Sequence, residues 1–278
     1  RVNNMEHDQY FKTQGTQIVV MLSGGMDSTL AFMISDLLGH SPIGLFVDLS
    51  QPYKSKELRV VNTLIRRYPN QIKKLSCHVI NKDNGNVPSI DVVGKAQIVQ
   101  GRNLTLATLG ANYGDDIWIC ADLGTLHHGC MVDKSHAFFN ETSDSLSHAF
   151  DRPTVVRSPV GHMTKTELIS LALEKGITER DILSTSTCYH DSLKRCGVCL
   201  TCFQRWTALT LNNMKERYTE SPNESEYAVA HKKKILDAWE AQDFSHYHVK
   251  RVIEVMKVFN LDTTLPLLPP HARRDVMI

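Results

Sequence analysis

The stretch Ser23-Gly-Gly-Met-Asp-Ser-Thr29 follows an apolar run at 17–22 and leads into a helical pattern of apolar residues that extends to 39. Glycines let backbone N–H groups approach an anion closely, and the N-terminus of a helix adds a favourable dipole. Ser23 and Ser28 add hydroxyl donors. The stretch therefore predicts a strand, a phosphate-binding loop and a helix. The alternative is a plain Gly-Gly turn capped by serines.

The loop differs from the usual Walker A sequence, which ends in Gly-Lys-Ser/Thr, because it contains no lysine. Asp27 stands there instead, and a carboxylate beside a phosphate requires a cation such as Mg²⁺ between them. The loop resembles the pyrophosphate loop of the N-type ATP pyrophosphatases, which split ATP into AMP and pyrophosphate. The resemblance implies that ATP is a co-substrate, bound by Ser23, Gly24, Gly25, Asp27, Ser28 and Thr29.

Composition limits the classes of function. The 278 residues carry a formal net charge of +1, which gives no general attraction for nucleic acid. No apolar run approaches the roughly 18 residues that a membrane helix needs, and residues 1–17 lack the apolar segment of a secretory signal. Seven cysteines, four of them close together, are typical of a reducing compartment and a metal site. We expect a cytoplasmic protein with no membrane contact.

Apolar runs alternate with helical patterns through the first two-thirds of the chain. This alternation predicts an α/β fold with a doubly wound, mostly parallel sheet of five strands. In such sheets ligands bind beyond the C-terminal ends of the strands, where the 23–29 loop would lie. The expected strands are 17–22, 43–48, 74–80, 116–121 and 154–157, and the expected helices are 27–39, 54–68, 98–113, 135–149 and 165–176.

A group of four cysteines follows this pattern: Cys188, Cys196, Cys199 and Cys202. Overlapping Cys-x-x-Cys pairs, with Gly197 in the turn, can present four sulfurs tetrahedrally to Zn²⁺ at about 2.3 Å. Four protein ligands close the coordination shell, so we expect a structural zinc. An iron–sulfur cluster accepts the same ligands and is not excluded by the spacing. A redox Cys-x-x-Cys would need only two of the four.

These patterns predict that the chain is divided into three parts. Residues 1–183 are expected to form the α/β domain, 184–207 a zinc knuckle, and 208–278 a helical extension with a proline-rich tail. The Lys232-Lys-Lys234 run is interpreted as a solvated helix face.

The loop and the knuckle, at this separation, resemble those of the 7-cyano-7-deazaguanine synthases, and the resemblance covers about 17–206. Those enzymes have a nucleotide-binding α/β fold of the α hydrolase-like type. In queuosine biosynthesis they use ATP to convert 7-carboxy-7-deazaguanine and ammonia into a nitrile. Further segments match the family in order: Asp48-Leu-Ser-Gln51, Glu57-Leu58, Arg102-Asn103, Asp122, Asp133, Ser158-Pro-Val160, Thr164-Lys-Thr-Glu-Leu168 and Ser186-Thr-Cys-Tyr189.

The resemblance implies three catalytic residues. Asp27 would help to hold Mg²⁺, Ser28 would hold the departing pyrophosphate, and Lys165 would stabilise charge on the α-phosphate. A solvated lysine in the first turn of a helix is the alternative for Lys165.

The resemblance also implies four substrate-binding residues: Gln51, Arg102, Asn103 and Asp133. Arg102 would pair with the substrate carboxylate as a bidentate fork, and Asn103 or Asp133 would read the guanine-like edge. A structural salt bridge is the alternative for Arg102.

The segment Met131-Val-Asp-Lys-Ser-His-Ala-Phe138 departs from the family pattern, because it keeps the Asp and the Phe but lacks an Arg and a Glu. A related ligase that stops at the amide, or joins the acid to an amine of a partner macromolecule, is therefore a second hypothesis. A non-enzymatic nucleotide-binding module that docks a protein partner through 208–278 is a third. A tRNA-modifying sulfur or lysidine transferase would share the loop, but the near-neutral charge argues against it. A homodimer is also compatible with the sequence.

Overall fold

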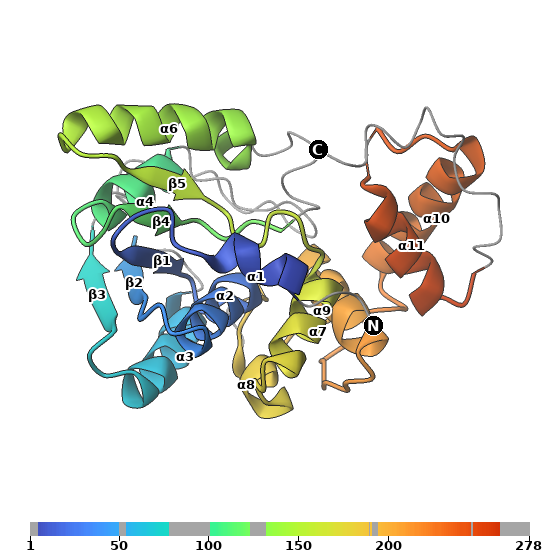
Figure 1. Cartoon of the computed structure of the whole chain (residues 1–278). Helices are drawn as coiled ribbons and strands as arrows, with labels where there is room; N and C mark the ends of the chain where they lie inside the picture. Colours follow the sequence, from blue (N-terminus) through green and yellow to red (C-terminus); the bar gives the residue numbers. More distant parts are fainter. Residues whose placement is uncertain are drawn as a thin grey trace, which may run out of the picture.

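The fold is built around one sheet of five parallel strands (Figure 1), as the sequence predicts. The computed structural model describes residues 5–49, 54–77, 101–122, 132–188, 190, 194–245 and 247–261. The strand order across the sheet is β3-β2-β1-β4-β5. The strands are β1 (Ile18–Leu22), β2 (Ile43–Asp48), β3 (Ile72–Ser76), β4 (Asp116–Trp118) and β5 (Val155–Arg157).

Helices cover both faces of the sheet, which makes it doubly wound (Figure 1). Ile18, Val20 and Leu22 of β1 pack on one side, against α2 (Met26–Leu37), α3 (Lys54–Arg67) and α7 (Lys165–Glu174). Val19 and Met21 pack on the other side, against α4 (Arg102–Gly110) and α6 (His136–Ala149). Successive side chains of a strand point to opposite faces, so a strand between two helical layers must be apolar throughout.

The strand order reverses between β1 and β4, because the chain winds outward through β2 and β3 and then returns to the other side of β1. Loops that leave strands on either side of such a switch point diverge and open a crevice for a ligand. The 23–25 turn follows β1, and residues 119–122 follow β4. The sheet topology therefore brings these two segments together.

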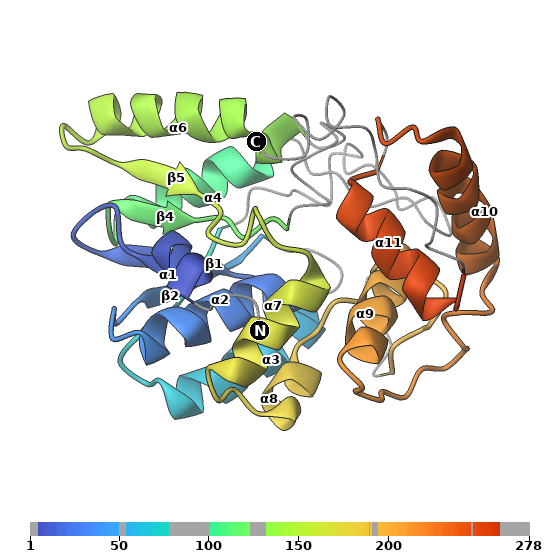
Figure 2. The same ribbon diagram turned by 45° about the vertical axis from the view of Figure 1, so that its right-hand side comes forward.

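Five further helices complete the described structure: α1 (Met5–Phe11), α8 (Glu179–Ser184), α9 (Leu200–Leu211), α10 (Glu226–Ala241) and α11 (Val249–Val258). Helix α9 packs against both α7 and α11, and α10 packs on α11 (Figure 2). The division of the chain at 183 and 207 stays a prediction. Among the helices described, none is both long enough and apolar enough to cross a lipid bilayer.

Helices α9, α10 and α11 share an aromatic core of their own. Within it, His231 of α10 stacks on Tyr227 with ring centroids 5.4 Å apart, and it meets the rings of Phe203 and Tyr247 edge-on at 5.4 Å. Lys232 departs from the expected solvated face, because its Nζ lies 4.9 Å from the ring centroid of Phe259. Lys233 and Lys234 are exposed, as expected.

We expect this aromatic core to lose stability in acid. Burial lowers the pKa of His231 from 6.5 to about 4, and the charges of Arg251 and Lys234 act in the same direction. The unfolded chain therefore binds the proton more tightly, and the stabilisation present above pH 6.5 is lost as the pH falls towards 4. The free energy of unfolding should fall by about 2–3 kcal/mol from this group between pH 7 and 4.5.

Urea unfolding at both pH values measures this loss. His231→Phe should remove that share of the pH dependence, and His148→Phe on α6 should leave it in place. Burial also lowers the pKa of His162, to about 3, so a remaining pH dependence is expected in the His231 variant. Equal pH dependence in wild type and His231→Phe would contradict the prediction.

Candidate functional site

The 23–29 loop is closed by its own hydroxyl groups. Ser28 Oγ accepts a hydrogen bond from the backbone N–H of Ser23 at 3.1 Å and lies 3.1 Å from Ser23 Oγ, which in turn accepts from Gly25 N–H at 3.3 Å. Helix α2 begins at Met26 with Gly25 as its N-cap, and no side chain caps it. The first N–H groups of a helix need partners from outside the helix. An anion such as a phosphate would satisfy them.

Gly24 is required by its surroundings. Its φ is +66°, which L side chains rarely adopt, and a Cβ there would lie 2.8 Å from the carbonyl oxygen of Glu57 on α3. The residue lets the loop pass close to the backbone of α3. Its own carbonyl accepts a hydrogen bond from Ser186 N–H at 2.8 Å, and Ser186 lies just before Cys188 in the chain. The 23–29 loop and the cysteine segment are therefore in direct contact.

A charged trio joins Asp27 of the loop to two buried residues, Lys165 and Asp122. Lys165 Nζ lies 2.8 and 2.5 Å from the two carboxylate oxygens of Asp27, and 3.1 Å from Asp122 Oδ2. The Lys165 side chain is only 10% exposed, so it is not the solvated lysine that was the alternative. Two carboxylates share one ammonium, which leaves the trio with a net negative charge.

Burial acts to lower the pKa of Lys165, but the carboxylates of Asp122 and Asp27 outweigh it and raise that pKa. Lys165 therefore stays charged. Burial raises the pKa of the Asp27 carboxyl, Lys165 opposes the shift, and the charge of Asp122 adds to it. A second cation beside Asp27 and Asp122 would balance the remaining negative charge.

Local structure fixes two members of the trio. Lys165 is the first residue of α7, whose N-cap, Thr164, forms a capping box with Glu167. Asp122 follows β4, and Ser158 Oγ after β5 accepts from Ala121 N–H at 3.0 Å and donates to Ala121 O at 2.7 Å. The ends of two adjacent strands are thereby tied together beside Asp122.

The structure also brings together Arg102, Asn103 and Asp133. The buried Asn103 amide donates to the backbone carbonyl of Asp133 at 2.9 Å, so the short 3-10 helix η2 (Val132–Lys134) is attached to the start of α4. Among the residues described, no carboxylate forms an ion pair with Arg102, which does not support the structural salt bridge. Gln51 lies outside the described residues.

Lys134 is a charged neighbour of the trio to which the sequence gave no role. Burial lowers the pKa of Lys134, the positive charge of Arg102 adds to the effect, and the carboxylates of Asp133 and Asp122 oppose it. The Lys134 charge also acts on Asp27. One signal was available in the sequence, because Lys134 directly follows Asp133 in the segment that departs from the family pattern.

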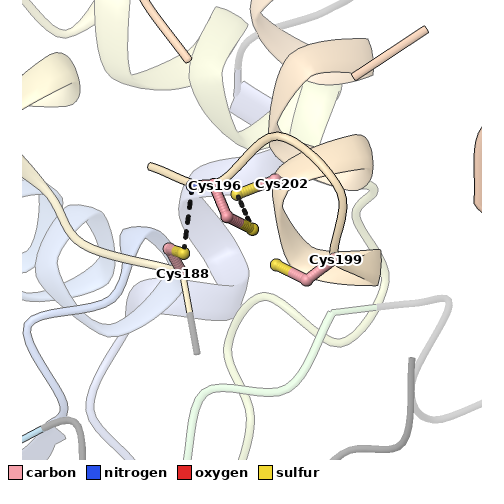
Figure 3. A group of neighbouring side chains, drawn as sticks. All are labelled: Cys188, Cys196, Cys199 and Cys202. Atoms are coloured by element: carbon pink, nitrogen blue, oxygen red, sulfur yellow. Dashed lines mark hydrogen bonds between the residues drawn. The ribbon is translucent and has the colours of Figure 1, made fainter. Parts of the chain in front are cut away.

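The four cysteines form one cluster, in which all the sulfur atoms lie within 4.8 Å of one another (Figure 3). Cys196 Sγ and Cys202 Sγ are 3.8 Å apart, close to the separation of about 3.8 Å expected for a tetrahedron with 2.3 Å zinc–sulfur bonds. Gly197 turns the chain with φ +87°, and a Cβ there would overlap the carbonyl of Glu220. The cluster is suited to zinc, as the sequence predicts.

Arg205 lies between the cysteine cluster and the segment that holds the 23–29 loop. This fully buried side chain of α9 lies one turn beyond Cys202 and forms a bidentate ion pair with Glu216 at 2.7 and 2.8 Å. Its Nη1 donates to Thr185 Oγ1 at 2.7 Å. The next residue, Ser186, holds the loop at Gly24. The cysteine cluster and the 23–29 loop therefore belong to one connected structure.

Comparison with known proteins identifies the family of the chain. The family described as "Queuosine biosynthesis protein QueC" matches residues 17–213. The chain is 26% identical over 216 residues to a 7-cyano-7-deazaguanine synthase of Pseudoalteromonas translucida, covering 72% of this chain and 96% of that protein.

Two further 7-cyano-7-deazaguanine synthases are similar to this chain. One, from Psychromonas ingrahamii, is 26% identical over 217 residues (72% of this chain, 96% of that protein). The other, from Thermoplasma acidophilum, is 25% identical over 228 residues (75% and 91%). These matches confirm the resemblance seen in the loop and the knuckle, and the family match covers well over half of the sequence. The chain therefore belongs to the QueC family of queuosine biosynthesis proteins.

Proposed function

We propose that the protein is an ATP-dependent ligase that adenylates 7-carboxy-7-deazaguanine and aminates it with ammonia, first to the amide and then to 7-cyano-7-deazaguanine, with release of AMP and pyrophosphate. The observation that carries the proposal is the buried Lys165, held by Asp27 and Asp122 beside the phosphate loop. The names of the similar proteins support the choice of substrate.

ATP would bind with its phosphates on the 23–29 loop. The uncapped N–H groups at the start of α2 and the hydroxyls of Ser23 and Ser28 are donors suited to pyrophosphate. Mg²⁺ would be held by Asp27. Asp122 shares the Lys165 ammonium with Asp27 and is therefore near enough to contribute. The two carboxylates carry more negative charge than Lys165 neutralises, which favours a further cation. When bound, this ion would neutralise phosphate charge.

Adenylation is needed because a carboxylate resists attack by an amine. The carboxylate oxygen of the acid attacks the α-phosphate, and the bond between the α- and β-phosphates breaks as pyrophosphate leaves. Lys165, which stays charged, would stabilise the negative charge that develops on the α-phosphate. Ammonia then displaces AMP and gives the amide. Nitrile formation would repeat the activation on the amide oxygen with release of a second pyrophosphate; loss of AMP and of the remaining N–H proton then gives the carbon–nitrogen triple bond, so two ATP are consumed per product.

The substrate would lie near Arg102 and Asp133. The Arg102 guanidinium is suited to a bidentate pair with the substrate carboxylate, and the Asp133 carboxylate can accept from the N–H groups of the base. For Asn103 we propose a role other than reading the base edge, because its buried amide already donates to the backbone carbonyl of Asp133. We assign it to holding Asp133 in place.

Product analysis tests the reaction. Incubation with ATP, 7-carboxy-7-deazaguanine and ammonia should give AMP, pyrophosphate and the nitrile by mass spectrometry. Orthophosphate and ADP would reject the assignment. Accumulation of the amide would favour the related ligase, and no AMP with any carboxylate would favour the nucleotide-binding module. A homodimer, a partner for 208–278 and a cytoplasmic location stay predictions.

Arg102→Ala and Asp133→Asn should impair use of the acid while ATP binding stays nearly unchanged, because neither residue belongs to the 23–29 loop. Losing one charge-assisted contact should lower kcat/KM for the acid by roughly 30- to 150-fold. Steady-state kinetics and calorimetry with ATP and with the acid measure the two effects separately. Arg66→Ala, at an exposed position on α3, is the matched control. Loss of ATP affinity alone in either variant would show that the residue has been assigned to the wrong ligand.

A further inference from the structure

Helix α11 lies beyond residues 17–213, the part that matches the family, yet it reaches the helix that carries Lys165. Glu254 Oε1 accepts a hydrogen bond from the hydroxyl of Thr164, the N-cap of α7. Both side chains are buried, with exposed fractions of 8% for Glu254 and 1% for Thr164. Helix α9, which packs against both α7 and α11, supports the contact from the side (Figure 2).

The hydroxyl of Thr164 both donates and accepts a hydrogen bond in this arrangement. It accepts from Glu167 N–H at 3.2 Å and donates to Glu254, while Glu167 Oε2 accepts from Thr164 N–H at 2.8 Å. A threonine hydroxyl has a single proton to donate. Glu254 therefore fixes the direction of the Thr164 O–H bond, which leaves the lone pairs of the Thr164 oxygen free to accept from Glu167 N–H and cap the helix.

A second contact from α11 holds the same capping box. Lys250 Nζ lies 2.8 Å from Glu167 Oε1. Glu254 itself is paired with Arg251 at 3.5 Å, and its negative charge stands at the N-terminus of α7, where the helix dipole favours an anion. One turn of α11 thus contacts both side chains of the capping box, Thr164 directly before Lys165 and Glu167 two residues after it.

We propose that Glu254 is a positioning residue, which fixes the first turn of α7 through Thr164 and so holds the Lys165 ammonium between Asp27 and Asp122. The proposal rests on the proposed function of Lys165. The proposal gives α11, which lies beyond the family match, a role in the reaction, because α11 holds in place a helix that lies within the match.

Two variants of Glu254 separate the effect of its hydrogen bond to Thr164 from the effect of its negative charge. Glu254→Asp keeps the charge but withdraws the carboxylate from the Thr164 hydroxyl, whereas Glu254→Gln keeps an oxygen within reach and removes the charge. A catalytic group displaced by a distant substitution can lose about 10- to 100-fold in rate. We expect Glu254→Asp to lower kcat for AMP formation by about tenfold or more, with KM for ATP unchanged, and Glu254→Gln to stay within about threefold of wild type. Glu240→Asp, at an exposed position on α10, is the control.

Amide hydrogen exchange gives a readout that does not depend on the reaction. The N–H groups of Glu167 and Leu168 both donate to Thr164, so they should exchange faster in Glu254→Asp and at the wild-type rate in Glu254→Gln. Faster exchange throughout the protein, including β1, would show a general stabilising contact and overturn the proposal. Wild-type kcat and exchange in Glu254→Asp, equal losses in both variants, or a loss confined to KM for ATP would also overturn it.

The two proposals fail in different ways. If the wild-type protein releases no AMP, the proposed function is wrong, and the exchange experiment still decides whether Glu254 fixes the first turn of α7. If the wild type is active and Glu254→Asp matches it in both readouts, the positioning role is wrong and the proposed function stands.

Discussion

Replacing Asp27 by Asn should lower the rate of AMP formation by roughly 100- to 1,000-fold. The amide of Asn keeps the shape of the side chain but removes its negative charge. In wild type we assign this carboxylate to Mg²⁺ binding, and its Oδ2 lies 2.5 Å from Lys165 Nζ. The variant should stay folded, because Lys165 keeps its ion pair with Asp122 at 3.1 Å. Rates measured across a magnesium titration should show half-saturation at a higher concentration than in wild type.

Asp36→Asn is the matched control for this prediction. Asp36 lies on the same helix, and its carboxylate accepts from Gln71 Nε2 at 2.8 Å, a bond that the amide oxygen of Asn can keep. The control should retain wild-type turnover. Wild-type turnover and magnesium dependence in Asp27→Asn would exclude Asp27 from both the catalytic and the metal-binding role.

Replacing Cys199 by Ser should lower the free energy of unfolding by several kcal/mol and reduce the soluble yield. Structural zinc contributes its binding free energy to folding, and Cys199 is both a member of the cluster and the N-cap of α9. Helix α9 packs on α7, so the loss should spread to the α/β domain. ATP affinity should fall as well, since Ser186 near the cluster holds Gly24.

Elemental analysis and urea unfolding check the cysteine prediction. Wild type should carry about one zinc per chain, since the four cysteines form one closed site. Cys77→Ser, which changes a partly buried cysteine outside the cluster, should lower the free energy of unfolding by only about 1 kcal/mol or less. Iron in the purified protein, or a well-folded protein without metal, would refute the zinc assignment.

The sequence located the helices and strands well where the pattern of buried residues is local. The edge strand shows the limit, because β3 begins at Ile72 although the apolar run predicted a start at 74. Lys73 and Lys74 are exposed on this strand, as is common at the edge of a sheet, so an apolar pattern does not mark its beginning. Helix α1 was missed for a related reason. It is short and polar, and we attribute its stability to contacts such as Phe11 against Trp118, with ring centroids 5.9 Å apart.

The sequence by itself determined the strand, turn and helix around residues 23–29, the parallel α/β fold and the cysteine cluster. Each depends on residues close together in the chain, whose spacing sets the backbone geometry directly. Only the tertiary structure decided that Lys165 lies between Asp27 and Asp122 and that Glu254 accepts a hydrogen bond from Thr164, the N-cap of the helix that carries Lys165. Lys165 and Asp27 are separated by 138 positions, and they meet because the strand order reverses beside β1. Such contacts depend on how whole elements pack, and no local pattern records that packing.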